Sequence, residues 1–195
     1  AQTLSQEAGK PIRAARNEVD RAVFTFTLAA EESTRIYGEY LPLDWQEFTA
    51  GRWGVVRRFP VGPVAGITPF HFPLNLVAHK VAPAIAAGCP IVVRPAEQTP
   101  LSALLLAETV QQAGWPDGGL NVVPLAQPDA DVLVTDERIK LISFTGNSER
   151  GWEIKRRCGK KKVALELGGN CAVIVHNDAD VPYAAERCVS GGFSY

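Results

Sequence analysis

From Val64 onward, short apolar runs alternate with stretches in which apolar residues recur at helical spacing. The apolar runs predict strands at Val64–Thr68, Ile91–Arg94, Leu120–Val123, Leu141–Phe144, Val163–Leu167 and Ala172–Val175. The helical patterns predict helices at Leu74–Ala87, Pro100–Ala113, Asp129–Thr135, Ser148–Cys158 and from Val181 onward. Strands separated by helices in this way form βαβ units, whose parallel sheet is buried on both faces. We therefore predict an α/β fold, with a Rossmann-like parallel sheet and helices on both faces.

The chain before Val64 has a different organisation. Residues 1–36 are polar and rich in alanine, and their apolar positions between Val19 and Ala29 approximate a helical stripe, which predicts a long helix in this segment. From Tyr37 to Phe59 the composition changes to aromatic residues, Pro and Gly. The segment Trp53–Phe59 alternates enough to predict an exposed or hairpin strand. Residues 37–61 are therefore expected to form an arm that contributes to subunit contacts.

The composition argues against two classes of partner. With 46% hydrophobic residues, 21% charged residues and a formal net charge of −1, the chain resembles a soluble globular protein and lacks the basic excess typical of nucleic-acid binding. The basic tract 155–162 is interpreted as a solvated helix end whose cations suit the helix dipole, with binding to nucleic acid or an anionic surface as the alternative. No membrane partner is expected, because the longest weakly polar stretch, Val81–Val93, is shorter than the roughly 20 residues that span a bilayer.

The four cysteines do not follow a recognisable pattern. The spacings between Cys89, Cys158, Cys171 and Cys188 match neither a metal-binding pair nor a dense disulfide framework, so no metal is expected. Cys89 precedes an apolar run, where a free cysteine acts as a small hydrophobic residue. We therefore expect structural, reduced thiols and a cytoplasmic location.

Three polar turns directly follow predicted strands, namely Thr68–Phe70, Arg94–Glu97 and Thr145–Asn147. In open parallel sheets, ligands bind beyond the carboxyl ends of the strands, so these turns are expected to meet at a nucleotide site. The sequence contains neither a Gly-x-Gly-x-x-Gly turn nor a Walker A loop. The turn Gly146–Gly151 still predicts backbone amides at a helix start, which suits a phosphate, although such a cap can be purely structural.

Two carboxylates are candidates for chemistry. Glu97 follows a predicted strand and can accept hydrogen bonds from two ribose hydroxyls, with an exposed loop charge as the alternative. Glu166 interrupts the apolar run Val163–Leu167. Burial there would disfavour the charged form of the carboxylate, which suits a general base, and a structural carboxylate is the alternative.

Five blocks carry a resemblance to a known family: Ile67–Pro73, Ala78–Ala84, Arg94–Pro100, Ile142–Gly146 and Glu166–Gly169. In order and spacing they resemble the NAD(P)-dependent aldehyde dehydrogenase superfamily. The chain is similar in particular to members that act on small hydroxylated or substituted aldehydes, such as lactaldehyde or glyceraldehyde dehydrogenases. The resemblance implies that residues 1–195 form most of a cofactor-binding domain and that the catalytic domain is absent.

The resemblance also implies a reaction and its residues. In the family, a cysteine thiolate attacks the aldehyde, a hydride passes to nicotinamide, and a glutamate activates the water that hydrolyses the thioester. Glu166 matches the glutamate, Lys80 matches a lysine near the catalytic centre, and His71 stands where an asparagine normally helps to hold the oxyanion. Misplacing an oxyanion donor typically costs on the order of 10²–10³ in rate. The residues that match the cofactor site are Ile67, Thr68, Pro69, Phe70, Arg94, Ala96, Glu97, Gly146, Asn147 and Leu167.

Three residues depart from the family pattern. Arg94 replaces the usual lysine, Asn147 replaces the usual serine, and Arg150 stands where a small apolar residue often faces the nicotinamide. Glu97 would repel a 2′-phosphate and favours NAD, whereas Arg94 could offset this repulsion and admit NADP. We expect NAD as the cofactor, with NADP as the alternative.

None of the four cysteines matches the family's nucleophile, which shortly follows a segment like Gly191–Tyr195. We therefore expect the isolated chain to lack dehydrogenase activity, and a full-length parent to oxidise a small-molecule aldehyde as a homo-dimer or tetramer. One alternative is a CoA-acylating relative, in which the thioester is transferred to CoA instead of water. The other is a non-catalytic nucleotide-binding module.

Overall fold

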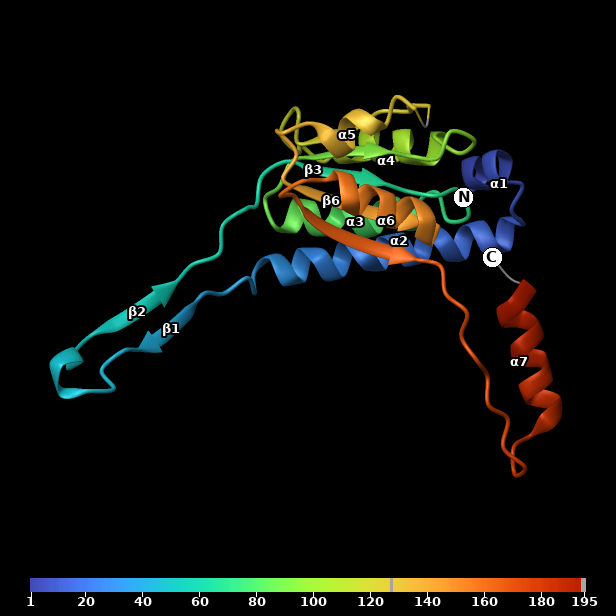
Figure 1. Ribbon diagram of the computed structural model, residues 1–195. Helices are drawn as coiled ribbons and strands as arrows, with labels where there is room; N and C mark the ends of the chain where they lie inside the picture. The colour runs from blue at the N-terminus through green and yellow to red at the C-terminus, as the bar shows by residue number, and fades with distance from the viewer. Residues whose placement is uncertain (127, 194–195) are drawn as a thin grey trace.

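Five parallel strands form the central sheet of the computed structural model, which describes residues 1–126 and 128–193 (Figure 1). Their order across the sheet is β5-β4-β3-β6-β7, and each neighbouring pair is parallel. The strands are β3 (Val64–Ile67), β4 (Ile91–Arg94), β5 (Leu120–Val122), β6 (Leu141–Gly146) and β7 (Lys162–Leu167). Each lies on a predicted apolar run, so the predicted parallel α/β sheet is confirmed.

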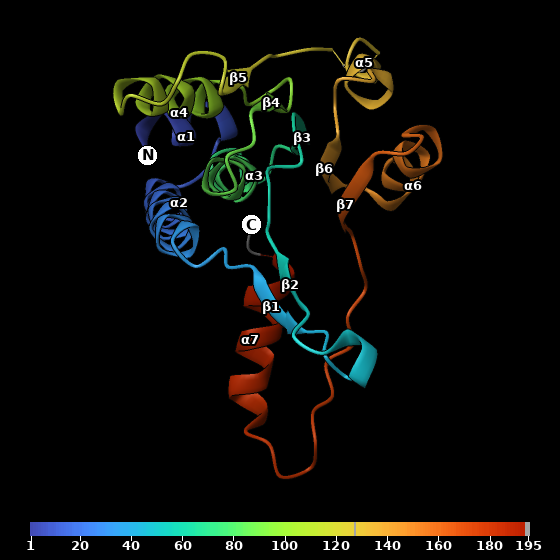
Figure 2. The same cartoon turned by 90° about the vertical axis from the view of Figure 1, so that its left-hand side faces the viewer.

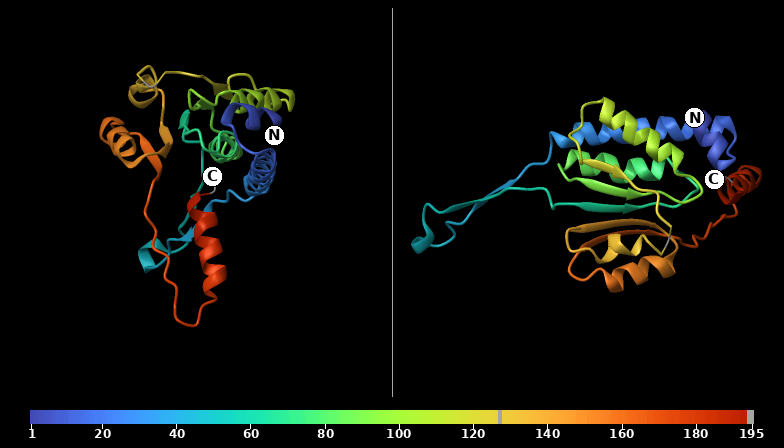
Figure 3. Two further views of the ribbon diagram at one scale, coloured as in Figure 1. Left: turned by 90° about the vertical axis from the view of Figure 1, so that its right-hand side faces the viewer. Right: turned by 90° about the horizontal axis from the view of Figure 1, so that it is seen from above.

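Helices cover the two faces of the sheet unequally (Figures 2 and 3). On one face, α3 (Asn75–Ala86) contacts β3 and β4, and α4 (Leu101–Gln112) contacts β5. Outside them pack α1 (Gln2–Ala8) and α2 (Ile12–Ser33). On the other face, α6 (Ser148–Arg157) contacts β6 and β7, and α5 (Asp131–Thr135) packs beside it. On the first face, no described helix packs over β7.

Alternate residues of the strands enter two different cores, because successive side chains of a strand point to opposite faces. Val64 joins Ile91 and Val93 in the core beneath α3 and α4. Ala65 and Ile67 join the core beneath α5 and α6. The other buried members of this second core are Leu133, Val134, Ile139, Ile142, Phe144, Ile154 and Cys158.

The long helix predicted within residues 1–36 is confirmed as α2 (Ile12–Ser33). A separate short helix, α1 (Gln2–Ala8), precedes it, with a turn between the two. Gly9 adopts a left-handed conformation with φ 63°, and Pro11 cannot donate a backbone hydrogen bond. Together these residues end α1 and start α2 in a new direction.

The predicted arm contains a two-stranded hairpin of β1 (Glu39–Pro42) and β2 (Trp53–Val56), joined by the short 3-10 helix η1 (Glu47–Thr49). The hairpin projects away from the sheet (Figure 1). Tyr40 and Trp53 stack across it with ring centroids 5.6 Å apart. The predicted strand Trp53–Phe59 is present only as far as Val56, beyond which the chain leaves the hairpin.

The C-terminal segment contains one confirmed and one wrong prediction. The helix predicted from Val181 is present as α7 (Val181–Phe193), which stands apart from the sheet (Figure 1). The strand predicted at Ala172–Val175 is wrong, since these residues form no regular structure and pair with no described strand. Strand pairing needs two segments to lie side by side, whereas the chain leads away from the sheet after β7 ends at Leu167 (Figure 1).

Candidate nucleotide-binding site

A cavity of about 480 Å³ lies at the carboxyl ends of β3, β4 and β6, where three loops meet. We call it the loop cavity. Because parallel strands end at the same edge of a sheet, segments far apart in the sequence come together there. Its lining residues are Ile67, Thr68, Pro69, Phe70, His71, Arg94, Ala96, Glu97, Gln98, Ala130, Phe144, Thr145, Gly146, Asn147, Arg150 and Ile154. The structure thus brings together all the predicted cofactor-site residues except Leu167.

The loop between β3 and α3, residues 68–74, supplies one wall. The Thr68 amide donates to the Arg94 carbonyl oxygen at 3.2 Å, which joins the first two loops. Thr68 is only 2% exposed, and its Oγ1 atom has no hydrogen-bond partner among the described residues. A buried hydroxyl without a partner is costly, so Thr68 is suited to a polar ligand in the cavity.

His71 on the same loop is held in its neutral form. Burial lowers the pKa of the imidazole below its ordinary value, and the nearby Lys10 ammonium lowers it further, whereas Glu18 acts in the opposite direction. A neutral imidazole carries one N–H donor and one acceptor nitrogen. At neutral pH, His71 can therefore donate a hydrogen bond without adding a positive charge.

The loop after β4 presents an ion pair. Arg94 Nη2 lies 2.7 Å from Glu97 Oε1, and Arg94 Nε donates to the Leu125 carbonyl oxygen at 2.9 Å. The Arg94 side chain is mostly buried, whereas that of Glu97 is exposed. The carboxylate can therefore reach a ligand in the cavity while its charge is partly balanced by the guanidinium.

The third wall is the start of α6. Asn147 is the N-cap residue, and its Oδ1 atom accepts from the Arg150 amide at 2.8 Å. Gly146 lets the chain pass close to the core, because a Cβ atom there would lie 2.6 Å from Phe144 Cζ. The partial positive charge of a helix N-terminus suits an anionic group, so the predicted helix start and cap are confirmed in the position that a phosphate could use.

Arg150 belongs to an ionic network between α5 and α6 that the sequence reasoning missed. Its two terminal nitrogens lie 2.5 Å from Asp131 Oδ1 and 2.6 Å from Glu153 Oε2. Arg157 pairs with the same two carboxylates at 2.7 and 2.9 Å. This network links α5 to α6 beside the cavity. The sequence offered only one signal for it, the presence of two arginines and a glutamate on neighbouring turns of one helix.

Lys80 lies behind the cavity rather than in its lining. Its Nζ atom donates to Ser143 Oγ at 3.1 Å and to Thr145 Oγ1 at 2.9 Å, and Thr145 does line the cavity. Burial lowers the pKa of Lys80 to about 8, and the negative charge of Glu166 opposes this shift. Lys80 is therefore a buried amine whose proton is held less tightly than that of an ordinary lysine.

The expected burial of Glu166 is wrong in this structure. Glu166 pairs in register with Thr145, but its side chain is exposed. The reason is that β7 is an edge strand, and Glu166 lies on the face of β7 that no described helix covers. Leu167 points the other way, packs against the core beneath α6, and takes no part in the cavity lining.

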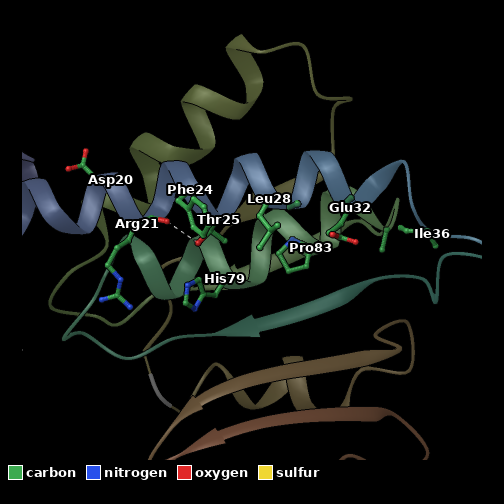
Figure 4. Close-up of a pocket in the computed structure, with 12 residues that line it drawn as sticks. Asp20, Arg21, Phe24, Thr25, Leu28, Glu32, Ile36, His79 and Pro83 are labelled. Atoms are coloured by element: carbon green, nitrogen blue, oxygen red, sulfur yellow. Dashed lines mark hydrogen bonds between the residues drawn. The ribbon is translucent and has the colours of Figure 1, made fainter.

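A second, apolar groove of about 810 Å³ lies between α2 and α3 (Figure 4). Phe24, Leu28 and Pro83 form much of its wall, and His79 and Arg21 lie near one end. Burial lowers the pKa of His79, and Arg21 lowers it further. The groove is larger than the loop cavity, but it does not lie at the strand ends, whereas polar groups from three strand ends converge in the loop cavity, where we place the candidate site.

Several further findings concern the described residues. No group of three or more His, Cys, Asp or Glu side chains in the described part of the chain is arranged to hold a metal ion. No helix among residues 1–126 and 128–193 is both long and apolar enough to cross a membrane.

The four cysteines are all free thiols. Cys89 and Cys158 are buried, whereas Cys171 and Cys188 are exposed. The predicted structural role of Cys89 in an apolar core is confirmed.

Comparison with known proteins adds to this geometry. The sequence model of the Aldehyde dehydrogenase family matches residues 1–195. A 3-sulfolactaldehyde dehydrogenase from Priestia megaterium is 45% identical over 197 residues, which cover 100% of this chain and 41% of that protein.

Two crystal structures are similar as well. Aldehyde dehydrogenase 21 from Physcomitrella patens, in complex with the reaction product succinate, is 53% identical with a TM-score of 0.92, over 98% of this chain and 40% of that one. A glyceraldehyde-3-phosphate dehydrogenase from Methanocaldococcus jannaschii, complexed with NADP, is 42% identical with a TM-score of 0.89, over 100% of this chain and 42% of that one. The chain thus spans about 40% of the length of the proteins that it matches.

Proposed function

Because the chain belongs to the aldehyde dehydrogenase family, we propose that it forms the cofactor-binding half of an enzyme that oxidises an aldehyde to a carboxylic acid with NAD(P)+. One observation supports this proposal: three loops after parallel strands converge on the loop cavity with an exposed carboxylate, an unpaired buried hydroxyl and a helix N-terminus. A dinucleotide needs this combination of groups, because it carries hydroxyls, planar rings and a diphosphate.

The residues of the cavity fit a dinucleotide in a defined arrangement. Glu97 would accept hydrogen bonds from ribose hydroxyls, and the α6 start at Asn147 would hold the diphosphate. Thr68, Pro69 and Phe70 would line the path between them. When bound, the nicotinamide supplies the acceptor for the hydride that leaves the substrate.

NAD is the cofactor that we propose, with NADP as the second candidate. The Glu97 carboxylate would repel a 2′-phosphate, which favours NAD. The ion pair with Arg94 reduces this repulsion, since the guanidinium lies 2.7 Å from the carboxylate. We therefore expect a preference for NAD that is moderate rather than absolute.

Three residues would serve the chemistry. Glu166 would activate water as a general base, and its exposure here leaves the carboxylate accessible to solvent. His71 would donate a hydrogen bond to the developing oxyanion through its neutral imidazole. Lys80, with a pKa of about 8, would exchange a proton through Thr145 and Ser143. Hydrolysis of the thioester is the outcome that we propose, and its transfer to CoA is the alternative.

The isolated chain is proposed to be inactive as a dehydrogenase. None of its four cysteines lines the loop cavity, and Cys89 and Cys158 are buried in the cores. A nucleophilic thiolate must reach the substrate carbonyl, so these thiols cannot start the reaction. Aldehyde-dependent NADH formation by the purified chain would contradict this proposal.

The hairpin arm is proposed to mediate subunit contacts in a dimeric or tetrameric full-length protein in the cytoplasm. Its large apolar side chains are exposed and have no core to enter. Exposed aromatic residues on a projecting hairpin are typical of a surface that another chain covers. These residues include Tyr40, Leu43, Trp45, Phe48 and Trp53.

The proposed function is tested by titrating the purified 195-residue chain with NAD+ and with NADP+ in a calorimeter. We expect saturable binding of both, tighter for NAD+. The variant Glu97→Gln should bind NADP+ about tenfold more tightly relative to NAD+ than the unmodified chain does, a change of about 1.4 kcal/mol. Glu108→Gln, the same change on an exposed side chain of α4, is the matched control. A folded chain that binds neither nucleotide would refute the proposed site.

A further inference from the structure

The two helices that follow the first two cavity loops start without capping side chains of their own. The N-cap residues of α3 and α4 are Leu74 and Pro100, and neither has a side-chain cap. The first amides of a helix have no partner within the helix, so an acceptor must come from elsewhere. In this protein it comes from the N-terminal segment.

Glu18 on α2 caps α3. Its Oε1 atom accepts from the amides of Leu74 and Asn75 at 2.9 and 3.0 Å. Its other oxygen pairs with Lys10 Nζ at 2.6 Å, and Lys10 also donates to the His71 carbonyl oxygen at 2.7 Å. The side chains of Lys10 and Glu18 are 1% and 0% exposed. This buried pair therefore holds the β3–α3 loop at its middle and at its end.

Glu7 on α1 does the same for α4. Its Oε2 atom accepts from the Leu101 amide at 2.7 Å, and its Oε1 atom accepts from the Ser102 amide at 3.0 Å. The Ser102 hydroxyl also donates to Glu7. These bonds fix the end of the loop that follows Arg94 and contains Glu97.

The two carboxylates are set relative to each other by the turn between α1 and α2. Gly9 ends α1 in the left-handed region, and Ser5 Oγ donates to the Lys10 carbonyl oxygen at 2.6 Å. Each carboxylate is also a negative charge at a helix N-terminus, where the helix dipole favours it. The N-terminal helices α1 and α2 thus reach both cavity loops.

We propose that Glu7 and Glu18 are positioning residues, through which the N-terminal helices hold the two loops in the shape that binds the nucleotide. This inference rests on the proposed function, since the loops matter as walls of a nucleotide site. Neither carboxylate lines the cavity, so each would act through the loop that it holds.

The main test is the double variant Lys10→Met/Glu18→Met. Replacing a buried ion pair by apolar residues of similar size is often neutral or stabilising, so this variant is expected to fold. It lacks both the α3 cap and the bond to the His71 carbonyl. We expect its Kd for NAD+ to rise about tenfold, which corresponds to a loop that is competent about a tenth of the time. Amide hydrogen exchange at Leu74 and Asn75 should become faster.

Glu7→Ala provides a second test on a less buried residue. It should raise the Kd for NAD+ and speed amide exchange at Leu101 and Ser102, whereas Glu7→Gln keeps one of the two acceptor oxygens and should restore part of the affinity. Glu32→Ala is the matched control, because Glu32 lies at the far end of α2 and pairs only with Arg35 among the partners that the structure shows. It should leave the Kd unchanged.

The experiments can distinguish a failure of the positioning roles from a failure of nucleotide binding. An unchanged Kd for NAD+ in the folded double variant and in Glu7→Ala would overturn the positioning roles, even if the free energy of unfolding fell. If the unmodified chain bound no NAD+, the proposed function would fail. In that case amide exchange alone would decide whether the carboxylates hold the loops, and unchanged exchange at Leu74 and Leu101 would overturn the inference.

Discussion

Lys80 makes the stability of this protein depend on pH in a way that can be calculated. Its ammonium group is buried, with 5% of the residue exposed, and among the described residues its hydrogen bonds go to the hydroxyls of Ser143 and Thr145. Burial lowers its pKa from the 10.5 of an ordinary lysine to about 8. The unfolded chain, in which Lys80 is solvated, keeps the ordinary value.

The direction in which stability changes with pH follows from the number of protons that the folded and unfolded chains bind. Between pH 8 and pH 10.5 the unfolded chain still binds the Lys80 proton and the folded chain has released it. Unfolding then takes up a proton, so raising the pH favours the folded state. Each tenfold change in an acid constant is worth about 1.4 kcal/mol, so the free energy of unfolding should rise by about 3 kcal/mol between pH 8 and pH 10.5. Below pH 8, Lys80 adds no such pH-dependent stability.

The assay compares free energies of unfolding in urea, followed by circular dichroism, for the unmodified chain and for Lys80→Met. All other ionisable groups are common to both proteins, so their contributions cancel in the comparison. The difference between the two free energies should therefore change by about 3 kcal/mol in favour of the unmodified chain as the pH rises from 8 to 10.5.

Lys160→Met is the matched control, because Lys160 is exposed in the turn after α6. Its difference from the unmodified chain should stay constant with pH. A constant difference for Lys80→Met as well would refute the reasoning, since it would mean that Lys80 has the same pKa in the folded and unfolded chains.

Two further predictions concern the cores and the thiols. Gly146→Ala should lower the free energy of unfolding by about 1–3 kcal/mol, because the added Cβ atom would lie 2.6 Å from the buried Phe144 ring. The control is Gly168→Ala, whose added Cβ atom would meet nothing within 4 Å. Equal free energies of unfolding for the two variants in a urea titration would contradict the argument. A thiol reagent should label two of the four cysteines in the folded chain, Cys171 and Cys188, and all four after unfolding. Mass spectrometry counts the labels, and rapid labelling of Cys89 or Cys158 in the folded chain would be inconsistent with their burial.

Much of the fold was predictable because its signals are local. Apolar runs such as Ile91–Arg94 predict buried strands, since a strand covered on both faces carries apolar residues at successive positions. The turns after these strands were predicted to meet, and Thr68, Glu97 and Asn147 do line one cavity. The parallel topology alone is sufficient for this result, because it places the carboxyl ends of the strands at one edge.

Other features depended on what packs over each residue. The apolar neighbours of Glu166 suggested burial, but the edge position of β7 leaves the carboxylate exposed. The apolar run Ala172–Val175 resembles a strand, yet no neighbouring strand pairs with it. In both cases the local sequence determines which side chains alternate, and the surrounding chain determines whether anything covers them or bonds to their backbone.

The sequence by itself determined the α/β fold, the order of strands and helices along the chain, and the polar turns of the candidate site. Only the tertiary structure decided which side chains hold those turns. Glu7 and Glu18 carry no local signal for their roles, because the amides that they cap belong to Leu101 and Leu74, far along the chain. Hydrogen bonds within a helix follow from spacing in the sequence, whereas a bond between distant segments forms only when folding brings donor and acceptor within about 3 Å.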